Sequence, residues 1–174
     1  ESGAVSLQRY WSPLELEWRP DVNEGEAVER VTSLLQDAVR KRLMADVPVG
    51  AFLSGGLDSS ANVALMSKLM PTALRTFSVG FHGFGQAENF HDLPFARLVA
   101  KEFGCDHSEV MISADECKEH LPRLVVQQDE PIGDPACLPM HFVSKAARDA
   151  GIKVVLVGEG SDEVFGGYDD MVTI

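Results

Sequence analysis

Residues 47–60 read Val-Pro-Val-Gly-Ala-Phe-Leu-Ser-Gly-Gly-Leu-Asp-Ser-Ser, and this stretch decides the fold. An apolar run from Val47 to Leu53 stops abruptly at a Ser-Gly-Gly turn. Beyond the turn, apolar residues recur at helical spacing through Leu69. The change of period predicts a buried strand, a tight turn and a helix.

The turn has the composition of an anion-binding loop. Gly55 and Gly56 let the backbone bend sharply with no Cβ in the way, so that consecutive N–H groups can point at one anion. The first turn of the helix adds unpaired amides and the positive end of the helix dipole. Three hydroxyls add donors, those of Ser54, Ser59 and Ser60. We interpret the stretch as a phosphate cradle; the alternative is an ordinary strand-to-helix turn capped by Asp58 or Ser59.

The spacing excludes two common phosphate loops. Neither Gly-x-x-x-x-Gly-Lys-Ser/Thr nor Gly-x-Gly-x-x-Gly occurs in the chain. The motif Ser-Gly-Gly-x-Asp-Ser instead resembles the pyrophosphate loop of the ATP pyrophosphatases, which split ATP between its α and β phosphates. A carboxylate among so many donors is explained if Asp58 holds the Mg²⁺ that accompanies pyrophosphate.

The rest of the chain alternates strands with helices. This order predicts a three-layer, Rossmann-like α/β fold, in which a parallel sheet carries helices on both faces and binds ligands at the carboxyl ends of its strands. Ser113 and Glu116 have the spacing of a helix capping box. Strands are expected over residues 49–53, 75–81, 107–112 and 154–157, and helices over 24–43, 61–69, 92–103, 114–128 and 140–150.

A second glycine-rich stretch follows the last predicted strand. Residues 158–168 place Glu159, Asp162 and Glu163 among four glycines. Taken alone, this is equally well explained as an acidic surface loop. Because both glycine-rich stretches follow strands of one parallel sheet, they can face a single pocket.

Four motifs in this order resemble the synthetase domain of the glutamine-hydrolysing asparagine synthetases, whose fold is of the adenine nucleotide alpha hydrolase type. They are residues 47–60, 76–81, 129–136 and 158–168. The resemblance implies an amidotransferase of asparagine biosynthesis. In that family ATP activates the side-chain carboxylate of aspartate as an acyl-adenylate, pyrophosphate leaves, and ammonia forms the amide. The ammonia comes from glutamine, hydrolysed in a separate glutaminase domain.

The resemblance also implies a role for individual residues. The phosphates would be held by Ser54, Gly55, Gly56, Asp58, Ser59 and Ser60. Adenosine would be flanked by Leu53, Val79, Val157 and Gly158. Asp58 and Asp162 would bind Mg²⁺, and Glu159, together with Asp162, would act beside the acyl-adenylate.

Composition limits the other classes of function. The formal charge of −12 over 174 residues argues against a nucleic-acid partner. No signal peptide or membrane-spanning segment is apparent, and the three scattered cysteines suit a reduced, cytoplasmic protein. Residues 1–23 are predicted to be a linker or extension. Residues 24–174 are expected to form the front half of a synthetase domain, incomplete at its carboxyl-terminal side and with little activity alone.

Two other functions stay open. A related amidotransferase could act on another carboxylate, such as a peptide, a polysaccharide-linked acid or a β-lactam precursor. A nucleotide-binding module without catalysis would share the same loops. A tRNA-modifying enzyme also uses the Ser-Gly-Gly-x-Asp-Ser loop, but the acidic charge and the second loop disfavour it.

Overall fold

The computed structural model describes residues 3, 5–12, 15, 21–83, 92–130 and 133–168. The chain divides into two compact units, Glu1–Leu35 and Gln36–Ile174, and the boundary falls inside helix α1 (Glu24–Arg42). At the start of this helix the side chain of Asn23 accepts a hydrogen bond of 2.9 Å from the backbone N–H of Glu26. The separate linker over residues 1–23 stays a prediction.

The second unit holds a four-stranded sheet in which all paired strands are parallel. Its strands are β1 (Val49–Phe52), β2 (Arg75–His82), β3 (Asp106–Ser113) and β4 (Val154–Leu156), in the order β3-β2-β1-β4. The helices that follow α1 are α2 (Leu57–Leu69), α3 (Leu93–Glu102), α4 (Ala114–Gln128), α5 (Cys137–Asp149) and α6 (Ser161–Phe165). The predicted alternation of strands and helices is confirmed.

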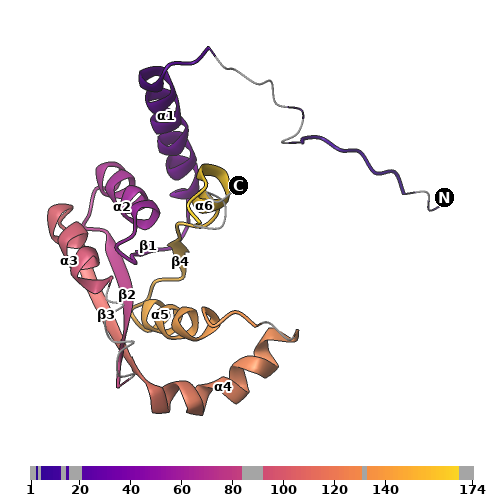
Figure 1. The fold of residues 1–174 in the computed structure, drawn as a ribbon. Helices are drawn as coiled ribbons and strands as arrows, with labels where there is room; N and C mark the ends of the chain where they lie inside the picture. Colours follow the sequence, from indigo (N-terminus) through magenta and orange to yellow (C-terminus); the bar gives the residue numbers. More distant parts are fainter. Residues whose placement is uncertain are drawn as a thin grey trace. The chain divides into compact units, whose positions relative to one another are not determined.

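Helices cover both faces of this sheet (Figure 1). On one face, Ala51 of β1 and Leu53, which directly follows it, pack against residues of α2 and α3, including the fully buried Val63 and Met66. On the other face, Phe77 of β2 packs against α5. Alternate residues of each strand point to opposite faces, so both cores are built from the same short strands. The three-layer α/β fold predicted from the sequence is therefore confirmed.

The structure differs from the sequence prediction at three places. Helix α5 begins at Cys137 rather than at residue 140, because Pro139 is tolerated in a first turn, where its missing N–H would have no intrahelical partner. Strand β4 was expected over residues 154–157 but ends at Leu156; its three residues are half-buried and it lies at the edge of the described sheet. The short helix α6 was not anticipated within the second glycine-rich loop.

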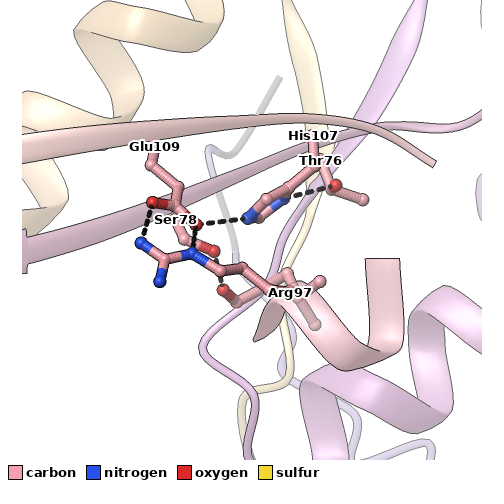
Figure 2. A network of polar contacts seen from close by, with 6 residues as sticks. Thr76, Ser78, Arg97, His107 and Glu109 are labelled. Carbon is pink, nitrogen blue, oxygen red and sulfur yellow. Dashed lines mark hydrogen bonds and ion pairs between the residues drawn. The ribbon is translucent and has the colours of Figure 1, made fainter. Parts of the chain in front are cut away.

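A polar network joins α3 to strands β2 and β3 (Figure 2). The guanidinium of Arg97 donates two hydrogen bonds of 2.7 Å to the carboxylate of Glu109. His107 Nδ1 lies 2.9 Å from Thr76 Oγ1. His107 Nε2 lies 3.5 Å from Glu109 Oε1 and has no hydrogen-bond partner among the described residues. The network holds a half-buried imidazole next to an ion pair.

This network predicts a pH dependence of stability. Burial lowers the pKa of His107 despite the nearby Glu109 carboxylate. A histidine with a lowered pKa contributes stability that is present above its unfolded-state pKa of about 6.5 and is lost as the pH falls through the folded-state value. We expect urea denaturation to show a fall in the unfolding free energy from pH 7.5 to 5, and a smaller fall in His107→Gln. The exposed His82, replaced by Gln, serves as the control; an equal fall in all three proteins would contradict the assignment.

Candidate nucleotide site

The two glycine-rich loops follow neighbouring strands. Strands β1 and β4 pair in parallel, with Gly50 opposite Val155 and Ala51 opposite Leu156. From β1 the chain moves outward through β2 to β3 and then returns, by way of α4 and α5, to the other side of β1. Ligands of open α/β sheets bind where the strand order reverses in this way, outside the carboxyl ends of the strands. The topology therefore brings both loops to the same edge of the sheet.

The first loop leaves the start of helix α2 open to an anion. Gly55 has φ +93°, in the left-handed region that favours glycine, and Gly56 is the N-cap of α2. The first intrahelical hydrogen bond runs from Ser60 N to Gly56 O, at 3.1 Å. The amides of residues 57–59 precede that bond and have no intrahelical acceptor. Free amides and the positive end of a helix dipole suit an anion, and anion binding at this turn stays a prediction.

The three serine hydroxyls brace this loop. Ser54 Oγ lies 2.9 Å from Ser59 Oγ and accepts a hydrogen bond of 3.2 Å from Gly56 N. The hydroxyls of Ser59 and Ser60 donate to Gly56 O, at 3.2 and 2.6 Å. These hydrogen bonds fix the shape of the loop. That the hydroxyls also donate hydrogen bonds to phosphate stays a prediction.

The second loop lies against the first turn of α2. A Cβ added at Gly158 would stand 2.9 Å from Ser59 N and 3.1 Å from Asp58 Cβ, closer than side-chain atoms normally approach. Asn62 Nδ2 donates a hydrogen bond of 3.1 Å to Val157 O, which ties α2 to the end of β4. Sequence reasoning missed Asn62. Its signal was a polar residue one helical turn after Asp58, on the same face of the helix.

The structure separates two residues that were assigned to adenosine. Leu53 is buried on the face covered by α2 and α3, whereas Val79 packs on the face covered by α5. Ser78, which the sequence analysis did not single out, donates a hydrogen bond from its buried hydroxyl to Leu53 O. The side chains of Leu53 and Val79 therefore do not come together, and their contact with adenosine stays a prediction. Val157 is exposed at the end of β4.

The acidic residues of the second loop lie on and beside α6. Asp162 is half-buried against Gly167, where an added Cβ would stand only 1.9 Å from Asp162 Oδ1. Glu159 is exposed. Glu163 accepts a hydrogen bond of 3.0 Å from the hydroxyl of Tyr168 and raises the pKa of that tyrosine. Glu159 thus keeps its carboxylate free of any hydrogen bond from the described residues, while Glu163 is engaged.

The donor set fits magnesium bound together with phosphate. Within the described ranges, no group of three or more histidine, cysteine, aspartate and glutamate side chains is placed to hold a metal ion. Mg²⁺ is usually held by one or two carboxylates with substrate phosphates and water completing its shell. Asp58 follows β1 and Asp162 follows β4, so the two strand ends provide two carboxylates. Their joint binding of Mg²⁺ stays a prediction.

Two further features, the hydrophobicity of the helices and the state of the cysteines, lie outside this site. No helix in the described part of the chain is long and apolar enough to cross a membrane. Cys105, Cys117 and Cys137 are free thiols, each half-buried. Burial raises the pKa of Cys105 and of Cys117, which disfavours reactive thiolates at both positions.

A parallel sheet with a glycine-rich strand-to-helix turn at its switch point is typical of the α/β domains that bind nucleotides. Residues 30–173 match the protein family described as asparagine synthase, and the chain belongs to that family. The resemblance inferred from the four motifs is confirmed.

The chain is similar to much longer relatives. It is 44% identical over 146 residues to a putative glutamine-hydrolyzing asparagine synthetase of Mycobacterium tuberculosis, and 40% identical to asparagine synthetase 1 of Bacillus subtilis. In both cases the match covers 84% of this chain and 22% of the relative. A match to a putative asparagine synthetase 2 of Methanocaldococcus jannaschii, at 39% identity, covers 87% of this chain and 28% of the relative. The chain thus spans about a quarter of the length of these relatives.

Solved structures with a similar fold share little sequence. The NH₃-dependent NAD synthetase of Campylobacter jejuni superposes with a TM-score of 0.51 at 15% identity, covering 80% of this chain and 60% of that one. The NMN synthetase of Francisella tularensis gives 0.53 at 17% identity, covering 80% and 58%. These likenesses support the fold assignment alone.

Proposed function

We propose that the chain is part of an ATP-dependent, amide-forming ligase that adenylates the side-chain carboxylate of aspartate. A carboxylate oxygen attacks the α-phosphorus of ATP, and the bond to the β-phosphate oxygen breaks, so that pyrophosphate leaves. Ammonia then attacks the acyl carbon, AMP leaves with the electron pair of the C–O bond, and the nitrogen loses a proton. The observation that supports this proposal is the close approach of Gly158 to the first turn of α2, which brings the second loop against the first.

In this proposal, positively polarised groups stabilise the phosphates, and an acidic residue orients the substrate. Negative charge builds up on the departing pyrophosphate, and preorganised amides and dipoles stabilise such charge. The open amides of residues 57–59 and the N-terminus of α2 supply them. Mg²⁺ held by Asp58 and Asp162 would neutralise the phosphates. Glu159, exposed and without a hydrogen-bonding partner in the described part of the chain, is free to orient the substrate beside the acyl-adenylate.

We propose aspartate rather than another carboxylate as the substrate because the curated relatives described above carry the name asparagine synthetase. Their names also include glutamine hydrolysis, which supports a glutaminase domain as the source of ammonia. A cytoplasmic location and the absence of a nucleic-acid partner stay predictions from composition. The alternative of a nucleotide-binding module without catalysis is not favoured, since both glycine-rich motifs are intact.

A chimera tests the reaction. The chain would replace the aligned 146-residue segment of the Bacillus subtilis asparagine synthetase 1, which it matches at 40% identity. We expect the chimera to exchange labelled pyrophosphate into ATP only when aspartate is present. Glu159→Gln is expected to reduce exchange by about 100-fold or more, within the range for removing one group that stabilises a transition state, while ATP binding changes little.

Glu163→Gln is the matched control, because it removes the same charge from the same loop but from a side chain engaged with Tyr168. It should keep most of the exchange activity. Exchange at the unsubstituted rate in Glu159→Gln would contradict the catalytic role. Exchange driven by a different carboxylate and not by aspartate would overturn the choice of substrate.

A further inference from the structure

A groove of about 310 Å³ lies between α4 and α5. Helix α5 contributes residues spaced three, four and seven positions apart, so that one face of the helix lines the groove. These residues are His141, Ser144, Lys145 and Arg148. None of them belongs to the glycine-rich loops, and α5 covers the face of the sheet opposite to α2 and α3.

Helix α4 faces them with His120, Arg123 and Gln127. The lining therefore joins three cationic side chains and two imidazoles with no carboxylate, in a chain of 27 acidic and 15 basic residues. Arg123 forms no ion pair with any residue in the described ranges. The concentration of positive charge is opposite to the net charge of the protein.

One carboxylate lies beside this cluster. Asp149 contacts Lys145 Nζ at 2.7 Å and Arg148 Nη2 at 3.4 Å, and its side chain is about half exposed at 52%. Exposed pairs of this kind contribute little and are easily exchanged. A single solvated aspartate thus leaves the cluster with excess positive charge.

Of the two histidines of the groove, His141 has a pKa that responds to this charge. The rings of His120 and His141 have centroids 5.3 Å apart, and both rings contact Phe142. Burial lowers the pKa of His141, and the positive charges of His120 and Arg123 lower it further, as do those of Arg148 and Lys145. On α4, the carboxylate of Glu116 lies near enough to His120 to interact with it electrostatically. An anion placed among these groups would favour the protonated imidazoles.

We propose that this groove binds a small polyvalent anion that carries phosphate or carboxylate groups. Guanidinium groups bind both kinds of oxyanion through paired, charge-assisted hydrogen bonds, and Arg123 and Arg148 supply one guanidinium from each helix. Ser144 and Gln127 add neutral donors. A bound anion would also relieve the repulsion between the cations. This site is independent of the proposed adenylation reaction.

Histidine NMR tests the site directly, because the glycine-rich loops contain no histidine. The chain is titrated with inorganic phosphate and, separately, with citrate at pH 6.5 and constant ionic strength. We expect a saturable shift of the ring signals of His120 and His141 and a rise in the pKa of His141. The double variant Arg123→Gln/Arg148→Gln should bind at least about tenfold more weakly, a change of about 1.4 kcal/mol.

The matched control is Lys68→Gln/Lys101→Gln, which removes two positive charges from exposed positions on α2 and α3. It should bind as the unsubstituted chain does. Saturation by one anion and not the other upholds the site and identifies the group recognised. The absence of a saturable shift with either anion would overturn the proposal, as would equal weakening in the control, since the effect would then be one of net charge.

Discussion

Replacing Gly55 by alanine is expected to lower the free energy of unfolding by roughly 2 to 5 kcal/mol, the sum of backbone strain and overpacking. Gly55 has φ +93°, which side chains other than that of glycine rarely adopt. A Cβ at this position would lie 2.7 Å from Ala96 N and 2.7 Å from Asp92 O. Both neighbours are backbone atoms at the start of α3, so neither can rotate away. Chemical denaturation followed by circular dichroism measures the change.

Gly104→Ala separates the two causes. Gly104 has φ +61°, but its missing Cβ would meet nothing within 4 Å. Strain alone is therefore expected there, at about 1 to 2 kcal/mol. If both substitutions cost the same, the packing of α3 on the first loop would not contribute, and the account of that contact would be wrong.

Replacing Gly158 by alanine is expected to weaken the binding of an ATP analogue by at least about tenfold, or 1.4 kcal/mol. The new methyl group would stand 2.9 Å from Ser59 N and 3.1 Å from the carbonyl carbon of Asp58. To make room, the second loop must move away from the first turn of α2. The amides that face the anion and the carboxylate of Asp58 would then lose their alignment with the second loop. Titration calorimetry measures the affinity.

Gly133→Ala is the control for this substitution. An added Cβ at Gly133 would meet nothing within 4 Å, and its backbone has no positive φ. The same change of residue should then leave the affinity unaltered. Equal affinity in Gly158→Ala and in the unsubstituted chain would show that the second loop takes no part in nucleotide binding.

The sequence predicted those features that depend on neighbouring residues. The capping box at the start of α4 is present as expected: Ser113 N donates to Glu116 Oε2 at 2.8 Å, and Glu116 N donates to Ser113 Oγ at 3.2 Å. The Ser-Gly-Gly turn, the parallel sheet and the meeting of the two loops at one edge were also predictable. Each follows from local propensity or from the handedness of strand–helix–strand connections.

Contacts between distant residues could not be predicted in the same way. The hydrogen bond from Asn62 to Val157 joins positions 95 residues apart, and the close packing of Gly55 on α3 depends on where that helix lies. The separation of Leu53 and Val79 is a matter of register. Phe52 pairs with Phe77, so Leu53 is level with Ser78, and Val79 points to the other face. A shift of one residue in pairing would have reversed this result.

Calorimetric titration of the chain with a non-hydrolysable ATP analogue, with and without Mg²⁺, tests most directly whether the two loops form a nucleotide site. We expect binding that depends on Mg²⁺ and is lost in Asp58→Asn, whose circular dichroism spectrum should match that of the unsubstituted chain. A folded chain that binds no analogue, or that binds it equally well without Mg²⁺ and in Asp58→Asn, would contradict the account.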